Sequence, residues 1–269
     1  WGERVVRSRN PKNVVDEMIH VREDYGVKRI IFWDDQLVSN PRRVLELCGE
    51  INLRKVQIPW VAFAHARSIR KDVLVAMKEA GCVEIQIGVE SGSDRILRLC
   101  QKGVSFSEIL KAANLVKEVG LRLHCFYMIG FPSETKEEMI RTLDSLWVID
   151  PNSALLSVVT PYPGTSLFAE ALKKGRLKGN HWLEADTEKG ESELVDTMSN
   201  RQFSVLSKLF WEEFNDFNFL KQAGQKSWLK ILKNRIKKNL RRKLTGKYTN
   251  LKTILIENPI FRFFFVNGR

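Results

Sequence analysis

Three segments of this 269-residue chain join an apolar run to side chains that can bind a polar ligand. Residues 87–93 end in GVESGS, residues 126–135 read FYMIGFPSET, and residues 158–165 read VVTPYPGT. Parallel strands deliver polar loops of this kind to one face of a barrel or of an open α/β sheet. We therefore expect the functional residues to lie along that face.

Glu90 is the carboxylate with the strongest case for a bound partner. It lies between an apolar strand and a glycine, where an unpaired carboxylate would be costly, so we expect a hydroxyl or ammonium partner. We favour helix-terminal roles for Asp35, Ser93 and Glu134, because carboxylates and hydroxyls stabilise a first helical turn. Arg67 has the alternative of pairing with a surface carboxylate. The polar residues predicted to share one rim are Asp34, Asp35, His65, Arg67, Glu90, Ser91, Ser93, Glu134 and Thr160.

The elements that must position these residues alternate between helix and strand. A helix is expected over residues 11–25, and five short apolar runs favour strands that right-handed βαβ units assemble into a parallel sheet. The expected strands are residues 29–33, 60–65, 83–89, 122–129 and 154–160. The helix-terminal signals between them are Asn40 before Pro41, Gly81, Gly120, and the capping boxes Ser105/Glu108 and Thr135/Glu138.

Composition limits the class of protein. With 43% hydrophobic residues the chain can bury a core, and it contains no apolar run near the roughly 18 residues of a membrane span. Its start shows no signal-peptide pattern, so a cytoplasmic location is expected. The cysteines have no metal-ligand spacing, which favours buried free thiols and predicts no metal ligand in this chain. They are Cys48, Cys82, Cys100 and Cys125.

The net charge of +12 resides in the last fifth of the chain. Residues 221–269 hold 14 of the 44 basic residues and only one of the 32 acids, Glu257. Apolar residues recur there every fourth position among lysines, which predicts a basic amphipathic helix. Such a helix rests on anionic lipid or phosphate, or packs on the barrel, and the sequence leaves both open. We expect three parts: a core of residues 1–168, a helical extension of residues 169–220 with a phenylalanine packing face, and this basic tail.

Six blocks in consecutive order resemble the core of one enzyme family. They read PKNVVDEMIH, FWDDQLVSNPRRVLELC, AHARS, MKEAGCVEIQIGVESGSDRIL, KGVSFSEILKAANLVKEVGLRLHCFYMIGFPSET and TPYPGTSLF. Over about residues 5–168 the chain resembles radical S-adenosylmethionine (SAM) enzymes, especially the branch that often carries a cobalamin-binding domain upstream. Several blocks at family-like intervals are far more specific than a single glycine motif.

The resemblance implies an α/β fold, a partial (βα)6 TIM-like barrel that lacks its first strand and has a C-terminal helical extension. It also implies that SAM binds at the strand ends beside a 4Fe-4S cluster and yields a 5′-deoxyadenosyl radical. The implied electron donor is a protein such as flavodoxin or ferredoxin, and cobalamin is implied where the upstream domain is present. The resemblance names no catalytic side chain. The cofactor-binding residues that it implies are Glu90 and Ser91 at the ribose, Met128, Gly130 and Phe131 along the adenine, Thr160 and Pro161 beyond the nucleoside, Asp34 or Asp35 at the methionyl ammonium, and Arg67 at its carboxylate.

One family feature is absent from the sequence. The C-x3-C-x2-C loop, which follows the first strand and holds the cluster in this family, does not occur in these 269 residues. We expect that loop and the first strand just upstream of Trp1. The four scattered cysteines cannot replace it, so we expect this chain alone to bind no cluster and to be inactive.

The expected reaction is radical methylation, rearrangement or ring formation on an unreactive carbon of a small-molecule or lipid substrate. One alternative is a radical tRNA methylthiotransferase, which the basic tail favours, although no β-rich RNA module follows the core. An alternative of another class is a cluster-less nucleotide-binding module or a membrane-tethered interaction module. The tail makes an anionic membrane surface a predicted partner, with a peripheral membrane location, and favours nucleic acid less.

Overall fold

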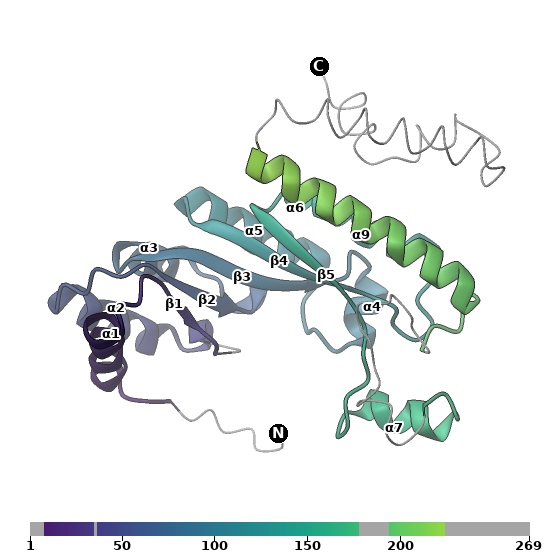
Figure 1. Ribbon diagram of the computed structural model, residues 1–269, viewed down its shortest axis with the longest axis horizontal. Helices are drawn as coiled ribbons and strands as arrows, with labels where there is room; N and C mark the ends of the chain where they lie inside the picture. Colours follow the sequence, from purple (N-terminus) through teal and green to yellow (C-terminus); the bar gives the residue numbers. More distant parts are fainter. Residues whose placement is uncertain (1–7, 35–36, 178–193, 224–269) are drawn as a thin grey trace. The chain divides into compact units, whose positions relative to one another are not determined.

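The computed structural model describes residues 8–34, 37–177 and 194–223. The chain divides into two compact units, the first made of Trp1–Gly88 and Val104–Cys125 and the second of Val89–Gly103 and Phe126–Arg269. In the described part, five strands form one sheet in the order β1-β2-β3-β4-β5, with β3 and β4 contributing to both units (Figure 1). The strands are β1 (Ile30–Phe32), β2 (Trp60–Ala64), β3 (Cys82–Glu90), β4 (Arg122–Ile129) and β5 (Ser153–Val158).

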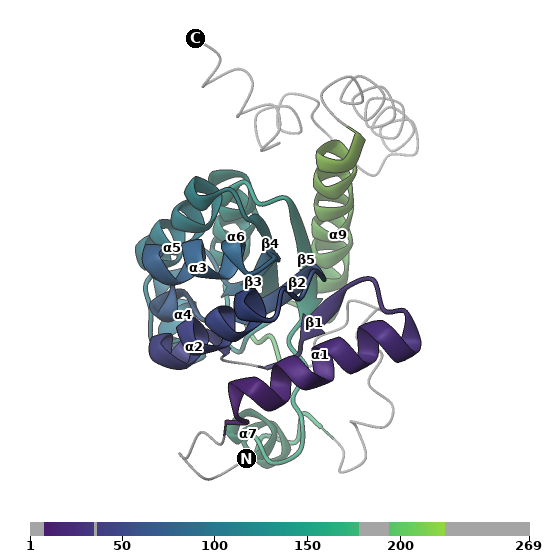
Figure 2. The same ribbon diagram turned by 90° about the vertical axis from the view of Figure 1, so that its left-hand side faces the viewer.

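The first unit alternates strands and helices as the sequence predicts. β1 pairs with β2, and β2 with β3, in parallel. Helices α2, α3 and α5 lie along the same side of these strands (Figure 2), and α1 contacts α2. The helices of this unit are α1 (Pro11–Tyr25), α2 (Pro41–Leu53), α3 (Lys71–Glu79) and α5 (Phe106–Val119), with short 3-10 turns η1 (Leu37–Ser39) and η2 (Ala66–Ser68).

Local sequence signals account for the helix ends in this unit. The Asn40 side chain accepts a hydrogen bond from the Arg43 amide ahead of Pro41, and Ser105 forms the predicted capping box with Glu108. Gly120 ends α5 in the left-handed conformation that a residue without Cβ adopts at little cost. These predicted termini are confirmed.

β1 has a free outer edge in the described part of the sheet. It pairs only with β2, and a cavity of about 420 Å³ borders β1 and α1, with Met18, Phe32 and Trp33 among its lining residues. Trp33 is 80% exposed, which is high for a large aromatic side chain beside a strand. An open edge at this place agrees with the expected partial barrel that lacks one strand.

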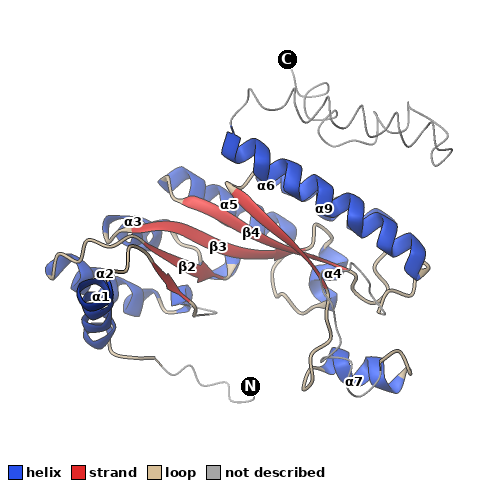
Figure 3. Cartoon of the chain, viewed as in Figure 1, coloured by secondary structure: helices blue, strands red, loops and turns tan. Residues whose placement is uncertain are grey.

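The second unit contains the ends of β3 and β4, all of β5, and a helix that covers β5. Helix α9 contacts β5 along its length (Figure 3), and its buried phenylalanines confirm the predicted packing face. Phe214 packs edge-on against Tyr127 at 5.2 Å, and the Asn218 amide bonds both the N–H and the carbonyl of Ala154 on β5. The helices of this unit are α4 (Asp94–Leu99), α6 (Lys136–Ile149), α7 (Ser166–Lys173) and α9 (Asn200–Ala223).

Two predicted boundaries were wrong by more than one residue. The helix expected to continue over residues 167–177 ends at Lys173, because Gly175 takes a left-handed conformation (φ 64°) that closes the helix. The strand expected to run to Thr160 ends at Val158, where the chain enters a proline-rich loop that cannot continue the ladder. The predicted loop over residues 179–200 and the basic tail lie mostly outside the described residues. Among the described helices, none is long and apolar enough to cross a membrane.

The four cysteines are free thiols, as expected. Cys48, Cys82 and Cys125 are buried, and burial raises the pKa of each thiol to about 12. Cys100 is half-buried on the end of α4. Thiols of this kind stay protonated at neutral pH and act as small apolar side chains.

Candidate functional site

Seven of the ten predicted site residues belong to the second unit, where they follow or end the strands β3, β4 and β5. Met128 and Phe131 pack in one hydrophobic cluster with Val159, the residue before Thr160. The Thr160 hydroxyl donates to the carbonyl of Val158, and Pro161 is buried. The cluster therefore joins the loops after β4 and β5. Its buried members are Ile96, Phe131, Val159, Ala171, Leu177 and Leu194.

Glu90 ends β3 in a strained backbone conformation. Its φ of 63° lies in the left-handed region, which costs a non-glycine residue about 1 kcal/mol or more. The Glu90 side chain is 20% exposed, and its Oε1 accepts a hydrogen bond from Lys102 Nζ at 2.9 Å. A hydroxyl or an ammonium partner was predicted for Glu90, and Lys102 supplies an ammonium. Lys102 was not among the residues predicted for the site.

Ser91 anchors the loop after β3 to helix α6. Thr142 donates its hydroxyl proton to the Glu138 carbonyl, so its oxygen accepts from both the Ser91 hydroxyl (3.0 Å) and the Gly92 amide (3.1 Å). Ser91 is fully buried, and its oxygen also accepts from the Ser93 amide. The Ser91 hydroxyl is thus engaged with α6 and with its own loop, and its predicted contact with a ribose stays a prediction.

Glu138 links the loops after β3 and β4. Its carboxylate accepts from the Ser93 hydroxyl (2.9 Å), from the Thr135 amide (3.0 Å) and from the Arg95 guanidinium. Arg95 also donates to the Ser133 carbonyl and hydroxyl. Hydrogen bonding to Arg95, more than any other cause, lowers the pKa of Glu138 to about 2. The capping box at Thr135 and the helix-terminal role of Ser93 are confirmed, and both belong to this network.

Glu134 was expected to act at a helix terminus, and this interpretation was wrong. Its side chain turns inward, is fully buried, and accepts with Oε2 from the amides of Gly130 (2.6 Å) and Phe131 (3.1 Å). Its Oε1 has no hydrogen-bond partner in the described part of the chain. Burial raises the pKa of Glu134 to about 7 against the effect of these amides. Glu134 therefore fixes the backbone of the loop whose residues were predicted to line an adenine.

The remaining predicted residues lie in the first unit. Asp34 is exposed after β1, and Asp35 lies outside the described residues. The His65 ring accepts a hydrogen bond from the Arg67 amide at the start of η2, and the Arg67 side chain is exposed. The pKa of Glu108 is lowered chiefly by hydrogen bonds from Ser105, with a contribution from the charge of Arg67. Within the described ranges, no group of three or more His, Cys, Asp or Glu side chains could hold a metal ion.

Comparison with known proteins identifies the superfamily. Residues 1–146 match the family model described as the radical SAM superfamily. The chain belongs to the radical SAM superfamily. This confirms the resemblance seen in the sequence blocks, and the parallel sheet with its helices agrees with the partial barrel expected for a radical SAM protein.

Individual relatives of this radical SAM chain differ in chemistry. It is 32% identical over 181 residues to an uncharacterized methyltransferase of Pyrococcus horikoshii, covering 67% of this chain and 39% of the relative. It is 29% identical over 171 residues to the anaerobic magnesium-protoporphyrin IX monomethyl ester cyclase of Cereibacter sphaeroides, covering 62% and 28%. The chain thus spans well under half the length of these relatives.

A solved structure supports the fold. The radical SAM methyltransferase TsrM from Kitasatospora setae, solved with cobalamin and a 4Fe-4S cluster bound, superposes with a TM-score of 0.56 at 19% identity. The superposition covers 62% of this chain and 34% of TsrM. At this identity the likeness concerns the fold, an α/β partial barrel with the strand order described above.

The described residues fit the two cofactors of a radical SAM protein unequally. The half-buried carboxylate of Glu90 is an acceptor of the kind that suits ribose hydroxyls, and the loop at Gly130 and Phe131 has a backbone ordered by Glu134. An iron–sulfur cluster needs closely placed thiolates, whereas Cys48, Cys82 and Cys125 are buried, protonated and apart in sequence. The described cysteines therefore do not fit the cluster.

Proposed function

We propose that this protein takes part in SAM-dependent radical chemistry, either methylation or ring formation on an unreactive carbon. The superfamily match and relatives that include methyltransferases and a cyclase support this proposal. When bound, SAM supplies a carbon–sulfur bond whose one-electron cleavage starts such reactions. The substrate class proposed is a small molecule or a lipid.

The contribution proposed for this chain is to bind and orient the adenosyl group. Glu90 Oε2 accepts from the ribose hydroxyls while Lys102 holds Oε1 and prevents the carboxylate from rotating away. The backbone from Met128 to Phe131 lies along the adenine, and Glu134 keeps two of its amides in place. Thr160 and Pro161 close the far side of the nucleoside.

Three residues of the first unit stay predictions for the methionyl end of SAM. By family resemblance, Asp34 or Asp35 would pair with its ammonium and Arg67 with its carboxylate. Asp34 and Arg67 are exposed, so these ion pairs contribute less than contacts in a dry site. The observation that carries the proposal is therefore Glu90, held by Lys102 at the end of β3.

The test is the affinity of this chain for S-adenosylhomocysteine, which needs no cluster, measured by isothermal titration calorimetry. We expect Glu90→Ala to weaken binding by about 1–3 kcal/mol, because buried hydrogen-bond partners lose their acceptor. Glu137→Ala, which removes an exposed carboxylate on the first turn of α6, is the matched control and should bind as the unsubstituted chain does. Equal affinity of the Glu90→Ala chain, with unfolding curves that show it folded, would remove Glu90 from the site.

A further inference from the structure

The loop after β4 is braced by a segment that lies outside the superfamily match. Residues 194–197 follow the matched residues 1–146 by almost fifty positions. Asp196 Oδ1 accepts a hydrogen bond from the Ser133 amide at 2.8 Å, and the Thr197 hydroxyl donates to the Glu134 carbonyl. Leu194 is buried in the same hydrophobic cluster as Phe131. Polar and apolar contacts from residues 194–197 thus reach the same loop, residues 130–135.

These contacts fall where the loop is strained. Ser133 has a φ of 57°, a left-handed conformation that a serine adopts only when its surroundings hold it there. Asp196 holds the Ser133 amide, and Arg95 holds the Ser133 carbonyl and hydroxyl. The next residue, Glu134, is bonded at its carbonyl by Thr197 and carries the carboxyl that orders Gly130 and Phe131. A change at Asp196 or Thr197 therefore acts on the backbone that presents the Glu134 side chain.

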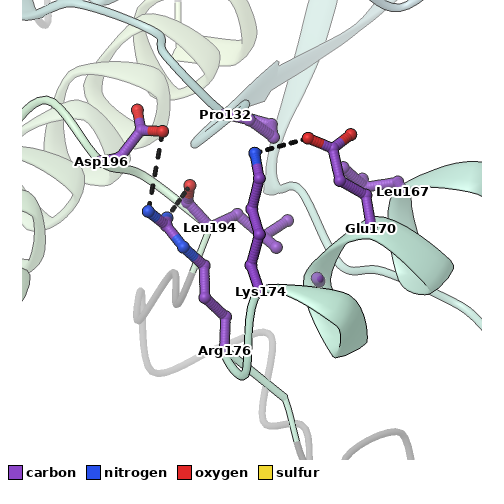
Figure 4. Close-up of a pocket in the computed structure, with 8 residues that line it drawn as sticks. Pro132, Leu167, Glu170, Lys174, Arg176, Leu194 and Asp196 are labelled. Atoms are coloured by element: carbon purple, nitrogen blue, oxygen red, sulfur yellow. Dashed lines mark hydrogen bonds and ion pairs between the residues drawn. The ribbon is translucent and has the colours of Figure 1, made fainter.

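Asp196 is itself held in place by Arg176, which follows α7 (Figure 4). Arg176 Nη2 lies 3.7 Å from Asp196 Oδ2, and Arg176 Nη1 donates to the Leu194 carbonyl at 2.7 Å. The Arg176 guanidinium thus holds both the Asp196 carboxylate and the backbone at Leu194. On the same surface, Lys174 pairs with Glu170, and both of these side chains are exposed (Figure 4).

We propose that Asp196 and Thr197 are positioning residues for adenosyl binding. By holding Ser133 and Glu134, they keep the backbone of Gly130 and Phe131, whose amides donate to the Glu134 carboxyl, in the arrangement that an adenine would pack against. They act through the loop and touch no ligand themselves. The inference rests on the proposed function, and it adds that the affinity for the adenosyl group depends on a part of the chain beyond the superfamily match.

The test compares truncating with conservative substitutions in the full chain. We expect Asp196→Ala and Thr197→Val to weaken S-adenosylhomocysteine binding about five- to tenfold, the effect of one lost hydrogen bond. Asp196→Asn and Thr197→Ser keep the acceptor and the donor, so they should bind within about twofold of the unsubstituted chain. Lys174→Ala is the matched control from the same surface. Amide hydrogen exchange over residues 130–135 should be faster in Asp196→Ala and Thr197→Val only.

The outcomes separate this inference from the proposed function. If the unsubstituted chain does not bind S-adenosylhomocysteine, the proposed function falls and the inference with it. If it binds and Asp196→Ala and Thr197→Val bind equally well, only the inference is overturned. The same follows if Asp196→Asn binds as weakly as Asp196→Ala, because the retained acceptor should rescue a positioning role.

Discussion

Two carboxyls four residues apart, Glu134 in the loop after β4 and Glu138 in the first turn of α6, have pKa values shifted in opposite directions. Burial raises the pKa of Glu134 to about 7, whereas hydrogen bonding to Arg95 lowers that of Glu138 to about 2. Glu138 is therefore ionised whenever the protein is near neutral pH, and its charge holds Arg95, Ser93 and Thr135 together. Glu134 changes its charge in the same pH range, beside the amides that it orders.

The raised pKa of Glu134 predicts how stability changes with pH. A carboxyl with a folded-state pKa above its unfolded value of 4.5 favours folding when protonated, so this contribution is lost as pH rises from about 4.5 to 7. The loss amounts to at most about 3 kcal/mol. In Glu134→Gln, which cannot ionise, we expect a flatter dependence of unfolding free energy on pH across this window. Denaturant unfolding at several pH values measures it.

Glu138 does not interfere with that experiment, because its stabilising charge is lost only as pH falls below 4.5 toward 2. Glu137→Gln, at an exposed position next to Glu138, is the control and should keep the original slope. The assignment of a raised pKa to Glu134 fails if its glutamine variant shows that original slope as well.

Residue-level prediction from sequence succeeded where the cause was local. The capping boxes at Ser105 and Thr135 need only residues three apart, and both formed. For Glu90 the sequence predicted the chemical type of the partner, but Lys102 meets it only once α4 has folded between them. Glu134 was misassigned because the start of a helix at Thr135 is a local signal, whereas the inward turn of Glu134 depends on the close packing around Gly130 and Phe131.

At the scale of elements, the close approach of α6 to the loop after β3 determines which residues that loop can contain. A Cβ added at Gly92 would lie 2.3 Å from the Arg141 carbonyl oxygen of α6, which is closer than real Cβ atoms come. The obstacle is helix backbone, so no side chain can move to relieve it. This approach lets the Gly92 amide reach Thr142 and keeps Ser91 buried.

Gly92→Ala should therefore destabilise the protein by about 1–3 kcal/mol, because either α6 or the loop must shift. The matched control is Gly49→Ala within α2, where nothing lies within 4 Å of the added Cβ. An alanine in that exposed helix interior should stabilise by about 0.5–1 kcal/mol. Thermal unfolding of both variants measures the contrast, and equal melting temperatures would show that α6 does not limit the loop.

The bounds of strands and helices were predicted well where the apolar periodicity and the end signals agree. β4 occupies the predicted residues 122–129, and α1 the predicted residues 11–25, since apolar periodicity and end signals agree there. The contacts between elements were not predictable, because Asn218 meets Ala154 and Asp196 meets Ser133 across more than sixty residues. Sequence periodicity carries no information about such pairings.

At the scale of the whole molecule, the excess of basic residues is concentrated in one segment of the chain. Removing residues 224–269 leaves 31 basic and 31 acidic residues, a net charge of zero, where the full chain has +12. The superfamily match ends at residue 146, so this charge lies outside the matched core. Long-range attraction to a polyanion should therefore depend on that segment alone.

Deletion of residues 224–269 should abolish binding to vesicles that contain anionic phosphatidylserine while sparing S-adenosylhomocysteine binding. Clustered basic residues contribute about 1 kcal/mol each near an anionic surface, and this attraction weakens over a Debye length. Co-sedimentation with anionic and with neutral vesicles, at low and at high salt, measures the effect. Vesicle binding that survives the deletion would contradict a membrane role for the tail. A different result would be that tRNA releases the protein from the vesicles and that tRNA binding weakens steeply as salt is added. That result would favour the methylthiotransferase alternative over a membrane surface.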